Sequence, residues 1–207
     1  MRRFKNAYAL ASEFIENPLW CNFWRNPEKL FKALGWEIIT YSTKDNPQLS
    51  TEAYSSYKNN KFYILYCIEN YETRKNYNLH HEGGHIIGAH PIRFGNILCK
   101  SSINTEKKFL EEEATIIGRN VFLPAYIIEY ILNHTKVSFN IVKKYFCDTY
   151  RLSKQYMDVR FEYLESDMLQ MTYPETIKRE AIKELLCFSL WHSKHYPIEH
   201  PNNFYID

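Results

Sequence analysis

Apolar side chains recur at helical spacing along most of the chain, and two short runs depart from that pattern. Residues 36–41 and 61–68 are aromatic and branched runs, which are typical of strands. The polar stretch 42–60 centres on Tyr54-Ser55-Ser56-Tyr57 and either contains another strand or forms a loop near a functional site. Helices are predicted over residues 6–16, 26–35, 73–89, 104–120, 126–133, 137–146, 153–164 and 174–192. The pattern predicts an α+β fold whose small sheet comes early and whose second half is helical.

The helix predicted after the second strand carries His81-Glu82-Gly83-Gly84-His85, an HExxH motif. Residues four apart on a helix are stacked neighbours, with Cβ atoms about 5 to 6 Å apart. His81 and His85 can therefore direct one ring nitrogen each at a common cation. Glu82 lies about 100° further round the helix, where a general base can reach a water on the open side of that cation. This grouping indicates a zinc hydrolase.

Two features beside the motif have alternative explanations. Gly83 and Gly84 each cost a helix about 1 kcal/mol relative to alanine. Either the packed helix tolerates this cost, or the glycines let the helix approach the sheet closely beside the metal. His90 follows His85 by five residues, near the end of the predicted helix. It either caps the last carbonyls, which we favour, or serves as a transition-state donor.

A third metal ligand is expected on the helix predicted over residues 104–120. Glu113 shares a face with the apolar residues Phe109, Leu110, Ala114, Ile117 and Val121. A carboxylate on that face needs a metal or another cation, so Glu113 is the predicted ligand, and an ion pair with Lys or Arg or an outward position is the alternative. Glu111 and Glu112 point elsewhere and are interpreted as solvated charges. Glu106, two turns before Glu113 on the same face, is the rival ligand.

These segments resemble the ImmA/IrrE type of metallopeptidases over roughly residues 30 to 165. Residues 77–85 match an aromatic-x-x-x-HExGH segment, and Glu113-Ala114 opens an apolar run that ends at Pro124. The resemblance implies a minimal zincin-like core, formed by a small sheet, the HExxH helix and a helix that bears the third ligand. It also implies Zn²⁺ held by His81, His85 and Glu113, with Glu82 as the catalytic base. The chain departs from the family pattern at His80, Gly83 and Thr115, which concerns substrate preference more than metal binding.

The same resemblance implies a function and a division of the chain. We expect a zinc-dependent endopeptidase, over residues 1–125, that cleaves a protein substrate, in this family a helix-turn-helix transcriptional repressor of a phage or mobile element. The alternative is a zinc-containing anti-repressor that binds its partner without cutting it. Residues 126–207 are expected to form a helical region whose segment 152–164 resembles a helix-turn-helix module, with a long turn at 148–151. A DNA-reading surface would use Lys143, Lys144, Arg151, Lys154 and Arg160, but we expect a solvated helix face instead.

Charge and cysteine content bear on partner and compartment. A net charge of +2 and a pI near 8.2 lack the strong basic excess of most nucleic-acid-binding domains, but charge alone leaves the partner open. The resemblance implies a protein partner. No apolar run has the length of a signal peptide core or a membrane span, and the scattered cysteines suit a reducing cytoplasm. We interpret the cysteines as small buried hydrophobes. They are Cys21, Cys67, Cys99, Cys147 and Cys187.

The chain's end carries a loose histidine group, formed by His192, His195 and His200. Its spacing matches no common metal site, and prolines interrupt it, so we interpret it as a surface cluster. Residues 196–207 are expected to extend over the surface or fray.

Overall fold

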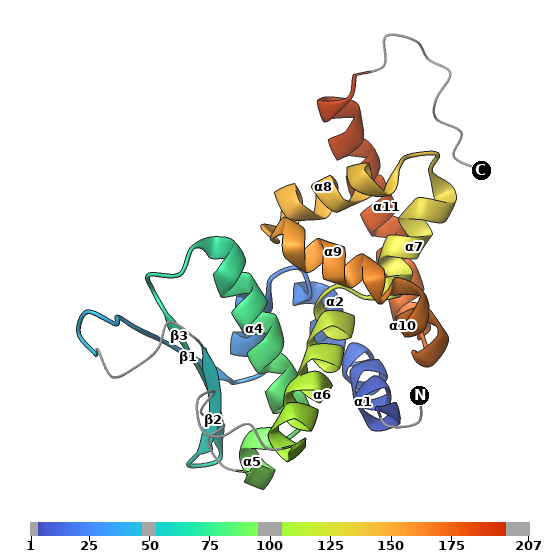
Figure 1. Ribbon diagram of the computed structural model, residues 1–207. Helices are drawn as coiled ribbons and strands as arrows, with labels where there is room; N and C mark the ends of the chain where they lie inside the picture. Colours follow the sequence, from blue (N-terminus) through green and yellow to red (C-terminus); the bar gives the residue numbers. More distant parts are fainter. Residues whose placement is uncertain (1–3, 47–52, 95–104, 198–207) are drawn as a thin grey trace. The chain divides into compact units, whose positions relative to one another are not determined.

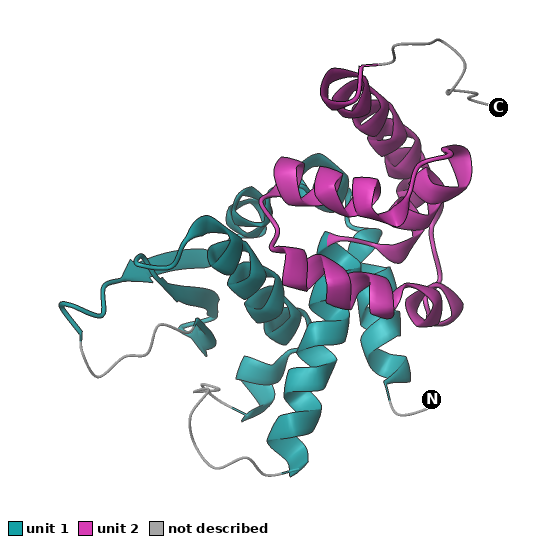
Figure 2. Ribbon diagram, turned by 45° about the horizontal axis from the view of Figure 1, so that its top comes forward, with its two compact units in different colours: residues 1–122 teal, residues 123–207 magenta. Residues whose placement is uncertain are grey.

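The computed structural model describes residues 4–46, 53–94 and 105–197, which form an α+β fold of eleven helices and three strands (Figure 1). The predicted α+β class is therefore confirmed. The chain divides into two compact units, residues 1–122 and residues 123–207 (Figure 2). This division lies three residues before the boundary predicted between residues 125 and 126.

The sheet of the first unit contains the two predicted strands and a third. The strands are β1 (Glu37–Tyr41), β2 (Tyr54–Lys58) and β3 (Lys61–Cys67). Their order is β1-β3-β2, with β1 parallel and β2 antiparallel to β3. Asn59 and Asn60 both have positive φ, 51° and 58°, which is the conformation of a tight two-residue hairpin. The polar stretch 42–60 therefore holds a strand, β2, at an edge of the sheet, while residues 47–52 lie outside the described ranges.

Helix α4 lies between this sheet and helix α6 (Figure 1). The helices of this unit are α1 (Lys5–Ile15), α2 (Pro18–Phe23), α3 (Pro27–Ala33), α4 (Glu72–Ile87), α5 (His90–Phe94) and α6 (Thr105–Phe122). Helix α1 packs on α6, and α3 contacts both β1 and α4. The Asn26 side chain caps α3, accepting from the Lys29 amide, and Gly35 follows the helix with φ of 77°. The short helices α2 and α5 were not predicted separately.

Helices α4 and α6 approach each other so closely that glycine is required on both. A Cβ on Gly84 would lie 2.1 Å from the carbonyl oxygen of Ala114, and one on Gly118 would lie 2.4 Å from the carbonyl oxygen of His80. A Cβ on Gly83 would lie 2.6 Å from an aromatic carbon of α3. The glycine pair does allow close approach, but the predicted approach to the sheet is wrong. The partner of Gly84 is α6 instead.

The second unit consists of five helices. They are α7 (Ala125–His134), α8 (Phe139–Tyr150), α9 (Lys154–Glu162), α10 (Leu164–Gln170) and α11 (Glu175–His195). Helix α11 packs along α7 and also contacts α8, while α9 packs on α8. Helix α8 continues through Tyr150, and Arg151 then adopts a left-handed conformation with φ of 52°. The long turn predicted at 148–151 is therefore wrong. The predicted helix 153–164 corresponds to α9, and α10 follows it after Tyr163.

Three of the five cations considered for DNA reading have partners within this unit. Arg160 is buried and donates to the Asp167 carboxylate at 2.7 Å and to the carbonyl of Leu123 at 2.8 Å. Its interpretation as a residue on a solvated face is wrong. Lys143 and Lys144 pair with carboxylates at 2.7 and 2.8 Å, those of Asp158 and Asp148 respectively.

The remaining predictions concern cysteines, the terminal histidines and membrane spans. Among the described cysteines no disulfide is formed; Cys67 is buried as expected, whereas Cys187 is exposed, and Cys99 lies outside the described ranges. His192 stacks on Tyr196 and His195 stacks on Trp191, while His200 and residues 198–207 lie outside those ranges. No single helix in the described part is long and apolar enough to cross a membrane, although α6 and α7 taken together pass by length and composition.

Candidate metal centre

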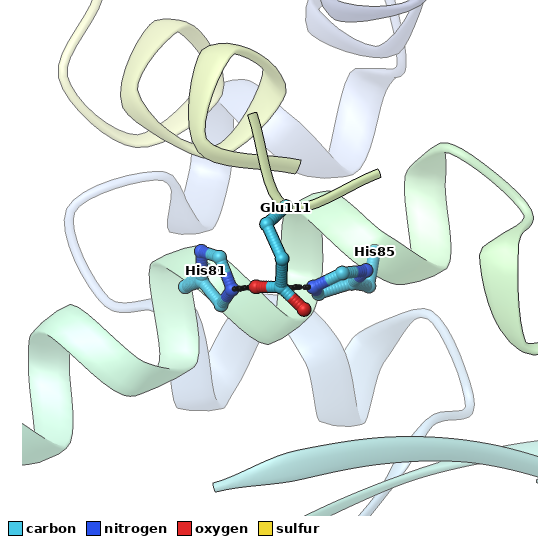
Figure 3. A group of neighbouring side chains, drawn as sticks. All are labelled: His81, His85 and Glu111. Atoms are coloured by element: carbon cyan, nitrogen blue, oxygen red, sulfur yellow. Dashed lines mark hydrogen bonds and ion pairs between the residues drawn. The ribbon is translucent and has the colours of Figure 1, made fainter. Parts of the chain in front are cut away.

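Two histidines of α4 and one glutamate of α6 converge at the border between these helices (Figure 3). Nε2 of His81 lies 2.9 Å from Oε2 of Glu111, and Nε2 of His85 lies 3.5 Å from the same oxygen. The two Nε2 atoms are 3.2 Å apart, and the imidazole planes are inclined at 83°. Three potential ligand atoms therefore face one another, as the four-residue spacing of the histidines predicts.

The separations fit a tetrahedral zinc ion. Bonds of about 2.0 to 2.2 Å at tetrahedral angles place ligand atoms about 3.3 to 3.6 Å apart. The observed 2.9, 3.2 and 3.5 Å lie within a few tenths of an ångström of that range. Two imidazoles and one carboxylate also form a donor set found in catalytic zinc sites, which keep a fourth position open. The His81 and Glu111 side chains are 16% and 31% exposed, so solvent reaches the group.

The electrostatic environment favours the ligand forms of these side chains. Burial alone would raise the pKa of Glu111, but hydrogen bonds to His81 and His85 outweigh it and hold the pKa well below its ordinary value. Burial lowers the pKa of His85 to about 4, so its ring is neutral at pH 7. An ionised carboxylate and a neutral imidazole are the forms that bind a metal ion.

The geometry favours Glu111, and not the predicted Glu113, as the third ligand. Glu113 is buried as predicted, but its Oε2 lies 3.0 Å from Nε2 of His90. The apolar face of α6 points at its contact with α4, whereas a site open to substrate must lie at the border of that contact. Glu111 is on that border, so its interpretation as a solvated charge is wrong. The rival Glu106 is exposed in the first turn of α6 and does not belong to the group.

His90 connects Glu113 to the candidate centre. Its ring is fully buried, and its Nδ1 lies 2.9 Å from Nδ1 of His85. Both ring nitrogens therefore face side chains, which differs from the carbonyl cap that we favoured from the sequence. Ala89, just before it, has a φ of 57°, and this left-handed turn begins α5 immediately after α4.

Thr115 is a neighbour of the centre that the sequence did not indicate. Its hydroxyl donates to the backbone carbonyl of Glu111 at 2.8 Å and lies 3.3 Å from Nδ1 of His81. It follows Glu111 by four residues, so the two lie on the same flank of α6. With Glu111 as the ligand, the four-residue spacing would have placed Thr115 beside the centre.

Glu82 lies on the side of α4 nearest the sheet edge. It is 3% exposed and interacts with Ser55 of β2. Burial raises the pKa of Glu82, a protonated His81 ring would lower it, and the charge of Glu111 raises it. Glu82 is therefore close enough to His81 and Glu111 for their charges to change its pKa. His80, by contrast, is a buried core residue that stacks on Phe122.

Comparisons with known proteins add no chemistry to this site. No protein-family model, curated protein or solved structure matches the chain. The function proposed below therefore depends on the contacts of these side chains and on the sequence motif.

Proposed function

We propose that this protein is a zinc-dependent endopeptidase, with His81, His85 and Glu111 as zinc ligands and Glu82 as general base. The convergence of the three ligand atoms carries the proposal, because the donor set and its separations suit catalytic zinc. The sheet, α4 and α6 would then be a minimal zincin-like core. The three protein ligands leave one coordination position for water or substrate, whereas structural zinc sites are usually closed by four.

The proposed chemistry divides between the metal and Glu82. Zinc held here would lower the pKa of a bound water towards about 7 and polarise the substrate carbonyl. The Glu82 carboxylate accepts a proton as the water oxygen attacks the carbonyl carbon. It then delivers that proton to the nitrogen of the leaving amine when the peptide bond breaks. Low exposure of Glu82 keeps bulk water from competing for the proton.

Strand β2 offers a platform for an extended substrate. It pairs with β3 on one side, lies at the edge of the sheet and contacts α4 and α5. A peptide can add to such an edge through backbone hydrogen bonds. Because Ser55 of β2 interacts with Glu82, a bound segment would run close to the general base. A DNA-binding repressor of a phage or mobile element, the substrate class implied by the motif resemblance, is the first substrate to test.

Two neighbouring glutamates of α6 provide a matched test of metal binding. We expect about one zinc per purified chain, and Glu111→Gln should weaken zinc binding at least tenfold because it removes an anionic ligand. Glu112→Gln is the control, since it changes the same residue type beside the site and should bind zinc as the unmodified protein does. Competition with a chromogenic chelator measures both affinities. Unchanged affinity in Glu111→Gln, or no zinc binding by the unmodified protein, would refute the ligand assignment.

Cleavage is tested with purified helix-turn-helix repressors, beginning with any that is encoded beside the gene for this chain, and fragments are identified by mass spectrometry. Glu82→Gln should retain zinc but lose about 10²-fold or more in cleavage rate, because its amide cannot accept the proton. Cleavage at the unmodified rate by this variant would exclude the mechanism. Release of the repressor from DNA by both proteins, with the repressor intact, would support the non-cleaving anti-repressor instead.

A further inference from the structure

We infer that Glu113 is a positioning residue, which acts through His90 to fix the ring tautomer of His85 that leaves Nε2 free for the metal. The inference rests on the proposed zinc site and gives a role to Glu113, which is neither a proposed ligand nor the proposed base. It concerns a line of three side chains, Glu113, His90 and His85, which we call the buried relay.

The buried relay is continuous and well shielded from solvent. Oε2 of Glu113 lies 3.0 Å from Nε2 of His90, and Nδ1 of His90 lies 2.9 Å from Nδ1 of His85. The side chains of Glu113, His90 and His85 are 11%, 0% and 2% exposed. Little water can therefore substitute for a missing partner. Nε2 of His85, at the other side of its ring, faces His81 and Glu111.

The donor and acceptor roles follow from the 3.0 Å contact between the Glu113 carboxylate oxygen and Nε2 of His90, because the oxygen accepts and the ring nitrogen donates. His90 must then carry a hydrogen on Nε2, which in the neutral ring leaves Nδ1 as an acceptor. His85 must donate from its own Nδ1, because one hydrogen is needed between the two rings. A neutral His85 with a hydrogen on Nδ1 has a bare Nε2, the form that binds a metal.

His81 reaches the same tautomer through a different partner. The Thr115 hydroxyl uses its one hydrogen to donate to the carbonyl of Glu111, so its oxygen is left to accept from Nδ1 of His81. When a metal replaces the hydrogen that His81 shares with Glu111, both histidines can present a bare Nε2 to the centre. The acceptor for His81 is a neutral hydroxyl, whereas His85 is linked to a carboxylate through a second ring.

The turn after α4 is built in a way that supports this role. Ala89 adopts φ of 57°, a left-handed conformation that is unfavourable for a residue with a Cβ. This turn starts α5 at once and sets the His90 ring between α4 and α6. The unfavourable turn is consistent with a need to position the His90 ring between Glu113 and His85.

The tautomer itself can be measured without zinc. In the metal-free protein labelled with ¹⁵N-histidine, long-range ¹H–¹⁵N spectra at pH 8 should show His85 protonated on Nδ1 and bare on Nε2. The His85 signals are assigned by their absence in His85→Gln. A hydrogen on Nε2 of His85 would overturn the relay even if zinc binds. The expected tautomer in a protein that never binds zinc would uphold the relay while refuting the proposed function.

Two substitutions of His90 separate positioning from packing. His90→Leu removes both polar contacts and should weaken zinc binding about 10- to 100-fold, as loss of a partner to a metal-bound histidine typically does. His90→Gln can still accept from His85 and donate to Glu113, so it should recover most of that loss. Both variants are compared by urea unfolding. A folded His90→Leu protein with unmodified zinc affinity and an unchanged His85 spectrum would contradict the relay, and if this variant does not fold, the spectrum of the unmodified protein decides.

Discussion

Substitution of Gly84 by alanine tests whether the close crossing of α4 and α6 holds the candidate centre together. The new Cβ would lie 2.1 Å from the Ala114 carbonyl oxygen and 2.8 Å from its carbonyl carbon. These are backbone atoms, which cannot rotate away as a side chain can. The helices must therefore separate by about 1 Å, and a gap of that size forfeits roughly a quarter to a half of each dispersion contact across the interface.

The expected change in unfolding free energy follows from two opposing terms. Alanine favours an interior helical position over glycine by about 1 kcal/mol. Overpacking costs about 1 to 3 kcal/mol, and contact with fixed backbone places Gly84→Ala at or above the upper value. We expect a net loss of about 2 kcal/mol or more. Zinc affinity should fall too, because the separation moves Glu111 on α6 away from the histidines on α4.

Urea unfolding followed by circular dichroism measures this change, with two companion variants. Gly118→Ala should cost a similar amount, since its Cβ would lie 2.4 Å from the His80 carbonyl oxygen. Gly83→Ala should cost less, because it meets the end of the Phe31 ring instead of backbone. The double variant should lose less unfolding free energy than the sum of the two single losses, because the Gly84 change already separates the helices. A Gly84→Ala protein about 1 kcal/mol more stable than the unmodified one, as helix propensity alone predicts, would refute this reasoning.

Three other outcomes are expected. Ala89→Gly should raise the unfolding free energy by about 0.5 to 1 kcal/mol, because glycine relieves the left-handed φ at a smaller entropic cost; a loss measured by urea unfolding would contradict it. Arg160→Met should cost about 3 to 5 kcal/mol by removing the cation that faces buried Asp167, and Asp167→Leu in the same chain should restore much of the loss; a single-variant loss below about 1 kcal/mol would count against this pair. Free zinc at about 100 times its dissociation constant should stabilise the protein by about 2.7 kcal/mol, so a chelator should lower the melting temperature, and an unmoved transition would argue against zinc binding.

The sequence predicted well those features that depend on local spacing. The four-residue interval between His81 and His85 was sufficient to place both rings at one point, because a helical turn imposes that proximity. The runs that form β1 and β3 were also recognisable from their aromatic and branched residues. The short helices α2, α5 and α10 contain too few turns to show an apolar period.

The choice between Glu111 and Glu113 shows what local spacing leaves undetermined. Helical phase identifies the residues of α6 that face α4, and Glu113 is indeed buried there. It does not say which part of that interface opens to solvent, which depends on where the chain places α4 and β2. The contacts of His90 were not predicted either. They depend on the left-handed turn at Ala89, and alanine is not a residue that indicates such a turn.

Because glutamates 111 to 113 are consecutive, the rotation of α6 about its axis decides which carboxylate faces which neighbour. They project about 100° apart, so one helix offers a carboxylate to the candidate centre, to its flank and to a buried histidine in turn. The glycine contacts with α4 fix which glutamate occupies which place. A single residue inserted between Glu113 and Gly118 would turn that segment by about 100° and exchange these environments while leaving its composition nearly intact. The rotation of α6 about its axis therefore decides which glutamate faces the candidate centre.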